Sequence, residues 1–253
     1  MLSLITRVQY QDLYHRMIAS ALGMCAGEQI EFVSAPNPEG QPVIAPTYNR
    51  LAERAKGEVL VFLHDDIEFV EEGWDSRLVE FFAEGWDIAG VVGVDKYEGG
   101  LLVSAGRPHC FGKFVNRSGN ELKVNLYGPK TNRPLVAVDG MFMACTADFF
   151  KGHKFDPALD GLFFYDIDWC LGKNVGLVDT LLAHHKPPER YGKYPEGMRQ
   201  MEDYEPYFYG KHGINPSGKT GDTRAVCASR EDYERYGHDA LYQLFEDKYP
   251  CLS

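Results

Sequence analysis

No apolar run in the chain is long enough to cross a membrane. The longest clean runs, residues 59–63 and 88–92, fall far short of the roughly 20 apolar residues that a membrane-spanning helix needs. The opening sequence, MLSLITRVQYQD, turns polar before the apolar core of a signal peptide could form. We therefore expect neither a membrane span nor secretion by a signal peptide.

Cysteine is sparse, and its spacing forms no recognisable motif. The chain has six cysteines and no Cys-x-x-Cys pair, which argues against a zinc ribbon, a thioredoxin site and a dense disulfide framework. We expect reduced thiols that mostly act as small buried hydrophobic side chains, as in a cytoplasmic protein. The six are Cys25, Cys110, Cys145, Cys170, Cys227 and Cys251.

Positive charge is also in short supply. Lys and Arg number 26 against 37 Asp and Glu, and the resulting formal charge of −11 disfavours duplex nucleic acid as a partner. The sequence has no Walker loop and no Gly-x-Ser-x-Gly elbow, and residues 90–93 (GVVG) are too short for a dinucleotide-binding loop. These absences point away from P-loop, serine-hydrolase and dinucleotide-binding functions.

What is present is an alternation of strand and helix patterns in 253 residues, enough for a sizeable core. Apolar residues at helical spacing separate short apolar runs, and Thr47 and Thr146 are placed to cap two of the helices. This alternation favours an α/β fold with a mostly parallel central sheet flanked by helices. Residues 98–133, rich in Gly, Asn and Lys, suit hairpins and loops instead. The predicted strands cover residues 2–6, 29–34, 58–63, 88–94, 136–145 and 175–183.

An imidazole and two adjacent carboxylates, those of His64, Asp65 and Asp66, follow one of these strands. In an open α/β sheet, ligands bind at the carboxyl ends of the strands. A divalent cation would remove the repulsion and desolvation cost of two buried carboxylates. The alternative is a solvated acidic turn, but the position at a strand end favours a metal site.

A second pair of carboxylates, Asp166 and Asp168, lies in the apolar and aromatic segment FFYDIDW, residues 163–169. Apolar surroundings raise the pKa of a carboxylate and make it a better proton acceptor. Residues two apart point in different directions, so one can be catalytic while the other only favours the helix terminus. The alternative is that both only cap a short helix.

Two further features are weaker. His184 and His185 end a predicted strand, where neighbouring side chains face opposite sides, so at most one of them would enter a shared site. Asp139-Gly140, followed by an apolar stretch, indicates a buried acidic strand residue or a turn.

Taken in order, these segments resemble the nucleotide-sugar-dependent glycosyltransferases of the GT-A type, specifically family-2-like members. The most specific match is residues 45–66, APTYNRLAERAKGEVLVFLHDD, which looks like the family's asparagine helix, Lys-Gly-Glu, strand and Asp-x-Asp segment. Residues 138–145 resemble the acceptor-side strand, and residues 165–171 resemble the Glu-Asp-x-Asp-x-x-x-Arg segment that supplies the catalytic base. The sequence departs from this pattern at His64, Tyr165 and Gly172, which replace the first Asp, the Glu and the Arg.

The resemblance implies a fold and a set of roles. It implies a GT-A-like (Rossmann-like) domain over residues 1–186, with residues 187–253 as a C-terminal extension that packs on it on the acceptor side. It implies a metal-dependent transfer of a hexosyl or pentosyl group to an acceptor hydroxyl, in a single displacement with inversion. Asp166 is expected to be the base, and the expected cofactor is Mn²⁺ or Mg²⁺. Expected metal ligands are Asp66, His184 and His185; nucleotide-sugar contacts are Thr6, Asn37, Asn49, His64 and Asp65; and Asp139, Gly140 and Asp168 lie on the acceptor or donor-sugar side.

Other functions stay open from the sequence. They are a nucleotide-sugar-binding module that has lost turnover, a sugar-phosphate nucleotidyltransferase and a metal-dependent phosphohydrolase. The donor nucleotide, the donor sugar and the acceptor are not identified by the sequence; a glycan, a lipid carrier, a small molecule, a protein and a modified nucleobase all remain as acceptors.

Overall fold

A computed structural model describes residues 1–37, 43–106, 108–118, 121–128, 130–185, 201–216 and 226–228. The helices are α1 (Gln11–Gly23), α2 (Ala45–Ala52), α3 (Trp74–Ala83), the 3₁₀ helix η2 (Leu102–Ala105), α4 (Ala147–Gly152), α5 (Tyr165–Cys170) and α6 (Met201–His212). The strands are β1 (Leu2–Val8), β2 (Ile30–Pro36), β3 (Val59–His64), β4 (Ile67–Phe69), β5 (Ile88–Gly90), β6 (Val92–Val94), β7 (Cys110–Ser118), β8 (Glu121–Leu126), β9 (Ala137–Val138), β10 (Phe142–Thr146), β11 (Val175–Leu177), β12 (Leu182–His185) and β13 (Val226–Ala228).

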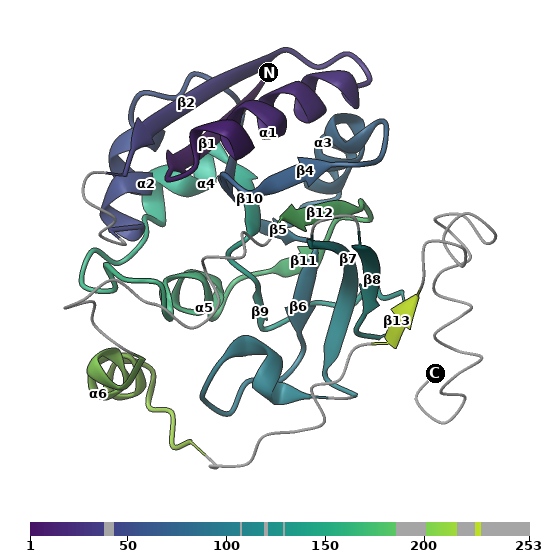
Figure 1. Ribbon diagram of the computed structural model, residues 1–253. Coiled ribbons are helices and arrows are strands. Elements are labelled where there is room, and N and C mark those ends of the chain that lie inside the picture. Colours follow the sequence, from purple (N-terminus) through teal and green to yellow (C-terminus); the bar gives the residue numbers. More distant parts are fainter. Residues whose placement is uncertain are drawn as a thin grey trace.

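The first sheet has the order β11-β5-β10-β3-β1-β2 and confirms the predicted α/β class. Strands β1, β2 and β3 pair in parallel, as do β5 and β11. Strand β10 is antiparallel to both of its neighbours, β3 and β5, so the sheet is mixed and the other five strands share one direction. Figure 1 shows this sheet in the upper part of the molecule, with α1 beside β1 and β2.

Both faces of the first sheet are covered, and alternate residues of its strands enter two separate cores. On β3, Val59, Val61 and Leu63 pack with α1 and α3, whereas Leu60 and Phe62 pack with α2, α4 and α5. This period of two follows from strand geometry, and burial on both faces explains why the strand is apolar throughout. The strand ends at His64, whose side chain is 29% exposed.

The second sheet has the order β13-β8-β7-β12-β4, and β6 joins it by pairing with β7 and β9. Its longest strands, β7 and β8, lie to the lower right of the first sheet in Figure 1, and β4 and β12 lie beside β10. The hairpin of β7 and β8 agrees with the hairpins predicted within residues 98–133. Because β4 directly follows β3 and pairs with β12, the chain crosses from one sheet to the other at Asp65 and Asp66.

Three predicted strands are each two strands in the structure. Residues 88–94 form β5 and β6, residues 136–145 contain β9 and β10, and residues 175–183 include β11 and the start of β12. In every case one of the two belongs to the first sheet and the other to the second. At the first crossing the buried Val91 continues the apolar pattern, whereas the other two crossings contain the partly exposed Asp139 and Asp179.

Of the two predicted helix caps, one is confirmed and one is wrong. The Thr146 side chain accepts a hydrogen bond from the Phe149 N–H at 3.2 Å and caps α4. Thr47 lies inside α2, which begins at Ala45 with Pro46 in its first turn. Proline suits a first helical turn because no intrahelical acceptor is available there for the missing N–H.

The described parts of residues 187–253 contact the rest of the chain. Strand β13 adds to the second sheet beside β8. Tyr204 and Phe208 of α6 are buried in one of the cores, and the Phe208 ring stacks on Phe164 with centroids 4.5 Å apart. A domain boundary at residue 186 stays a prediction.

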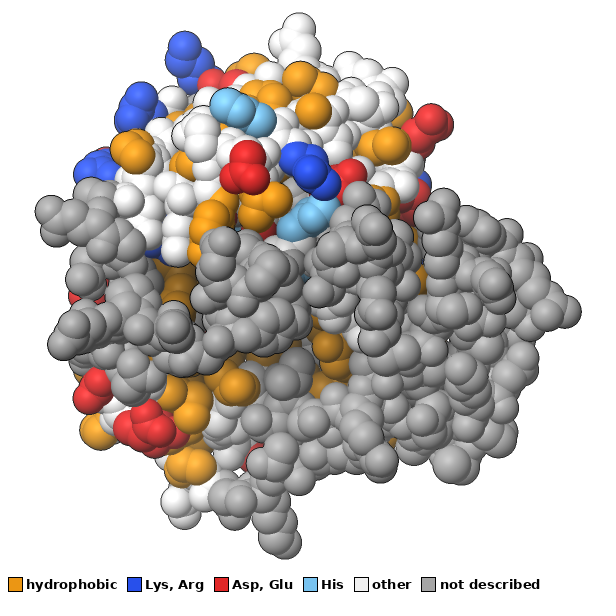
Figure 2. Space-filling view, viewed as in Figure 1, with side chains coloured by type: hydrophobic (Ala, Val, Ile, Leu, Met, Phe, Trp, Pro, Cys, Tyr) orange, Lys and Arg blue, Asp and Glu red, His pale blue; other side chains and the backbone are white. Residues whose placement is uncertain are grey.

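Three sequence expectations, on membrane spans, thiols and basic charge, can be compared with the structure. Among the described residues, no helix is both long and apolar enough to span a membrane. Cys25, Cys110, Cys145 and Cys170 are free thiols, and the last three are buried. On the face drawn in Figure 2, acidic and basic side chains are interspersed, and the described residues show no broad basic patch.

Candidate active site

The turn after β3 is anchored by Asp65. Its Oδ2 accepts hydrogen bonds from the backbone N–H groups of Gln9, at 2.6 Å, and Tyr10, at 2.5 Å. Asp65 is 2% exposed and thus joins the end of β3 to the segment that follows β1. The nucleotide-sugar contact expected for Asp65 stays a prediction.

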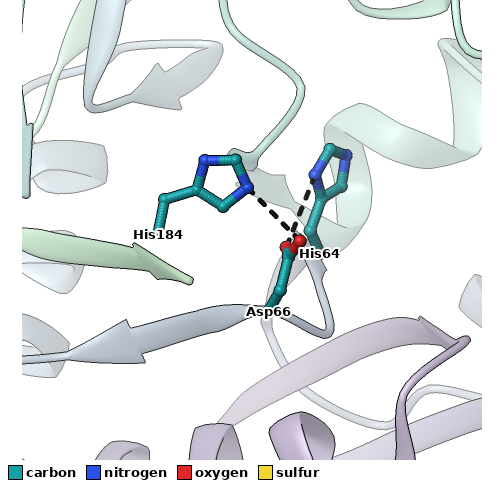
Figure 3. A group of neighbouring side chains, drawn as sticks. All are labelled: His64, Asp66 and His184. Carbon is teal, nitrogen blue, oxygen red and sulfur yellow. Dashed lines mark hydrogen bonds and ion pairs between the residues drawn. The ribbon is translucent and has the colours of Figure 1, made fainter. Parts of the chain in front are cut away.

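Asp66 lies between two imidazoles, as Figure 3 shows. Its Oδ2 is 3.3 Å from His184 Nε2, and its Oδ1 is 4.0 Å from His64 Nδ1. One ligand atom from each of the three residues lies within 4.8 Å of the other two. His64 ends β3, and His184 comes from β12 in the second sheet. The crossing between the sheets therefore brings together three side chains that can bind a metal.

The donor set of this cluster fits a divalent transition metal. Imidazole nitrogen suits Mn²⁺ and later transition metals better than Mg²⁺, which prefers an all-oxygen octahedral shell. The Asp66 side chain is fully buried, and a buried carboxylate is stabilised by a cation. Two imidazoles and one carboxylate would leave further coordination positions of a metal for oxygen ligands from a substrate.

His185 lies outside the cluster. Its Nε2 is 2.5 Å from Glu68 Oε2, on the opposite side of β12 from His184, and its backbone N–H donates to the Asp66 carbonyl at 2.8 Å. The expected opposite orientation of the two histidines is therefore what the structure shows. Only His184 of the pair lies where a metal held by Asp66 would be.

Tyr165 is a residue of the site that sequence reasoning missed. Its buried hydroxyl lies 3.2 Å from His64 Nε2 and donates a hydrogen bond to the Gly140 carbonyl at 3.2 Å. Gly140 has no room for a side chain, because a Cβ there would overlap the Tyr165 hydroxyl. The only sequence signal for Tyr165 was its departure from the family pattern.

A pocket of about 320 Å³ lies beside His64 and contains the second group of predicted residues. Asp166 is partly exposed there, and its carboxylate accepts hydrogen bonds from the N–H groups of Gly140, at 3.0 Å, and Ile167, at 2.9 Å. Burial, followed by the nearby charge of Asp139, raises the pKa of Asp166 to about 7. The lining residues are His64, Gly100, Leu101, Leu102, Asp139, Gly140, Leu162, Phe163, Phe164, Tyr165, Asp166 and Ile167.

Phe164, at the start of α5, has a left-handed backbone with φ of 67° and is the only non-glycine with positive φ among the described residues. Such a conformation is costly for an aromatic residue and persists only where packing enforces it. The stack on Phe208 supplies that packing. The strained residue sets the direction in which α5 presents Asp166.

Asp168 points away from this pocket. Its Oδ1 is 2.7 Å from His212 Nε2 and 2.7 Å from Lys211 Nζ, both at the end of α6. Asp166 and Asp168 therefore have different surroundings, as expected for residues two apart. Asp168 attaches α6 to α5, and its predicted place on the acceptor or donor-sugar side stays a prediction.

For three further residues, Asn49, Thr6 and Asn37, the expected contact with the nucleotide stays a prediction. Asn49 binds both backbone groups of Phe155, through Nδ2 at 2.8 Å and Oδ1 at 3.0 Å, and so fixes the loop after α4. The Thr6 hydroxyl and both amide atoms of Asn37 are buried without a hydrogen-bond partner among the described residues. Asn37 directly follows β2, at the edge where β1 and β3 also end.

The fold and this site define an α/β protein with a candidate metal cluster at a strand end and a carboxylate pocket beside it. The sequence model described as a "Glycosyltransferase like family" matches residues 3–186, and the chain belongs to this family. The match covers nearly the range over which the motifs resembled glycosyltransferases. No curated protein shows significant similarity to the chain.

A solved structure shows the same fold. The crystal structure of GalNAc-T7 with UDP, GalNAc and Mn²⁺ is similar with a TM-score of 0.55 and 13% identity, over 99% of this chain and 55% of that one. The structure of residues 1–349 of S. aureus TarS in complex with UDP gives a TM-score of 0.47 and 11% identity, over 74% of this chain and 61% of the TarS chain. The chain thus spans little more than half the length of these structures.

Proposed function

We propose that the chain transfers a sugar from a nucleoside diphosphate to an acceptor hydroxyl, by single displacement with inversion. The observation that carries the proposal is the position of His64, which belongs to the metal cluster and also lines the pocket of Asp166. A leaving diphosphate and an attacking hydroxyl need a cation and a base at neighbouring positions. The UDP and Mn²⁺ bound to GalNAc-T7, a protein of the same fold, support the nucleotide and the metal in this proposal.

Asp166 is the proposed base. A group whose pKa is raised to about 7 is half ionised near neutral pH and can take a proton from an acceptor hydroxyl. Its two backbone hydrogen bonds hold the carboxylate in one orientation. A base poised in this way favours an active enzyme over a binding module that has lost turnover.

Asp66, His64 and His184 would hold Mn²⁺ or Mg²⁺, with the nitrogen ligands favouring Mn²⁺. A cation bound there stabilises the negative charge of the departing diphosphate. The described residues contain a single cluster of this kind, whereas a metal-dependent phosphohydrolase commonly uses more clustered ligands. Asn37 and Thr6, with buried polar atoms at the edge of the first sheet, are the proposed contacts of the nucleoside.

The test is a thermal-shift screen of UDP, GDP, dTDP and CMP, with and without Mn²⁺, followed by transfer and hydrolysis assays with the matching nucleotide sugars. A ligand that binds only the native state raises the melting temperature by mass action. We expect one nucleoside diphosphate to stabilise the protein more in the presence of Mn²⁺ than in its absence. Four nucleotides without effect, with and without the metal, would contradict the proposal.

A further inference from the structure

Apart from its carboxylates, the pocket beside His64 is mainly apolar. Six of its lining residues are large hydrophobic side chains, and one of them, Leu101, is 49% exposed at the surface. Such a lining removes water from apolar groups of a ligand but offers few partners to additional polar groups. The six are Leu101, Leu102, Leu162, Phe163, Phe164 and Ile167.

The charge of the pocket has one sign. Asp139 and Asp166 contribute carboxylates, and among the described residues no lysine or arginine lines it. An anionic group on the acceptor would give up its hydration without gaining a lysine or arginine, and it would face both carboxylates. The cation proposed beside His64 would already be neutralised by the diphosphate of the donor. The overall charge of −11 acts in the same direction.

We propose that this pocket selects an acceptor whose hydroxyl is carried on an uncharged body with an apolar or aromatic face, and that it rejects acceptors carrying phosphate or carboxylate near that hydroxyl. The inference rests on the proposed function, because it takes Asp166 as the base of the transfer. It narrows the acceptor from any compound with a hydroxyl group to uncharged compounds with an apolar or aromatic face. Lipid phosphates and nucleic acids fall outside that class.

The test compares matched acceptor probes by calorimetry, with and without UDP and Mn²⁺. The probes are the phenyl and methyl β-glycosides of glucose, galactose, xylose and N-acetylglucosamine, together with glucose 6-phosphate. We expect at least one phenyl glycoside to bind about tenfold tighter than its methyl counterpart, since a buried ring contributes at least as much as the methyl groups that enzymes discriminate. Phe163→Ala should remove this advantage, and Leu22→Ala, which changes an exposed leucine on α1, should not.

Equal affinities for all phenyl and methyl pairs, or tighter binding of glucose 6-phosphate, would overturn the inference. The same titrations report UDP binding separately. Loss of UDP binding with an intact phenyl preference would refute the proposed function but leave the pocket's preference established. Normal UDP binding without that preference would refute only the acceptor class.

A second inference rests on hydrogen bonds and not on the pocket lining. The Tyr165 hydroxyl has one proton and two neighbours, the Gly140 carbonyl and His64 Nε2, each 3.2 Å away. A carbonyl can only accept, so both contacts are hydrogen bonds only when Tyr165 donates to Gly140 and accepts from His64. Nε2 of His64 then carries the imidazole proton.

We infer that Tyr165 is a positioning residue that fixes the His64 tautomer. With the proton on Nε2, the lone pair of the neutral ring is on Nδ1, the atom that faces Asp66. Hydrogen bonds to the second nitrogen of a histidine are the usual means of fixing a metal-binding tautomer. Gly140, which accepts from Tyr165, also donates its N–H to Asp166, so one residue connects the metal cluster with the proposed base.

The His64 tautomer can be read directly from the ¹⁵N shifts of its ring in the metal-free protein. We expect the Nε2–H form in the natural chain and a mixture of tautomers in Tyr165→Phe, together with a fall of about tenfold or more in Mn²⁺ affinity. Tyr48→Phe is the matched control, because it removes another buried hydroxyl, one that donates to the Leu63 carbonyl. It should leave tautomer and affinity unchanged.

The Nδ1–H form in the natural chain would overturn this inference, and that measurement needs no variant to fold. An unchanged tautomer in a folded Tyr165→Phe protein would overturn it equally.

Discussion

Two carboxylates, Asp75 and Asp166, have opposite chemistry although both are held by backbone N–H groups. Asp75 lies in the first turn of α3 and accepts hydrogen bonds from the N–H groups of Ala26, Gly27 and Glu28 at 2.8 to 3.1 Å. Burial alone would raise the pKa of Asp75, but these bonds and the Cys25 thiol outweigh burial and lower it to about 2. At Asp166, burial and Asp139 outweigh two backbone donors, and the pKa rises to about 7.

The difference separates a structural carboxylate from one available for chemistry. Asp75 connects α3 with the loop that follows α1. Its surroundings stabilise the charged form so strongly that the carboxylate has little affinity for a proton. The surroundings of Asp166 favour its neutral form, so the folded protein is stabilised when this carboxylate takes up a proton. Burial alone does not identify a candidate base; the balance between donors and nearby negative charge does.

The strongest test of this comparison is Asp166→Asn. If Asp166 takes the proton of the acceptor, the variant should lose about 10²–10⁴-fold in turnover while donor affinity stays nearly normal. Asp168→Asn is the matched control on the same helix, since Asp168 contacts Lys211 and His212 and does not line the pocket. A fully active Asp166→Asn enzyme, or a dead Asp168→Asn beside it, would move the base elsewhere.

The next effect concerns metal affinity. Asp66→Asn should weaken Mn²⁺ binding by about 100-fold, because it removes the only carboxylate of the cluster. His184→Ala should lose about tenfold, whereas His185→Ala should bind Mn²⁺ normally, because its ring contacts Glu68. Titration of Mn²⁺ followed by electron paramagnetic resonance measures all three. Equal losses for the two histidines would contradict the geometry.

Local sequence rules predicted the parts of the site that depend on one strand or one turn. The position of His64 and Asp66 at a strand end and the opposite directions of His184 and His185 follow from strand periodicity. The rules could not predict contacts between distant segments. Asp168 meets His212 across 44 positions of sequence, and Asn49 meets Phe155 across 106.

The same limit explains what was missed in the fold. A strand that leaves one sheet for another can keep its apolar pattern, as it does at the buried Val91 between β5 and β6. Asp139-Gly140 was read as either a buried acidic strand residue or a turn, and local rules could not show that the chain changes sheets there. Pro46 in the first turn of α2 was a signal for the helix start that the reading of Thr47 as a cap overlooked. Tyr165 gains its role only when α5 meets His64, a contact that no spacing in the sequence encodes.

A smaller effect is expected on stability at neutral pH. Asp75→Asn should lower the free energy of unfolding by about 2 kcal/mol, because a pKa held near 2 means that the fold favours the charged form over the neutral one. Urea unfolding measures the change. Asp148→Asn, which alters an exposed residue in the first turn of α4, is the control and should unfold almost as the natural chain does. A stable Asp75→Asn protein would show that the loop does not depend on this carboxylate.

The last test compares how pH changes the contributions of Asp75 and Asp166 to stability. The pKa of Asp75 is lowered from 3.8 to about 2, so its contribution to stability is present above pH 4 and is lost as pH falls toward 2. The pKa of Asp166 is raised from 3.8 to about 7, so its contribution is present below pH 4 and is lost as pH rises through 7.

Urea unfolding between pH 3 and 8 should therefore show the stability advantage of the natural chain over Asp75→Asn shrinking in acid. Relative to the natural chain, Asp166→Asn should gain stability as pH rises from about 4 to 7. Parallel pH profiles for the two variants would mean that backbone donors and burial act alike at both positions, and the distinction between a structural and a chemical carboxylate would then fail here.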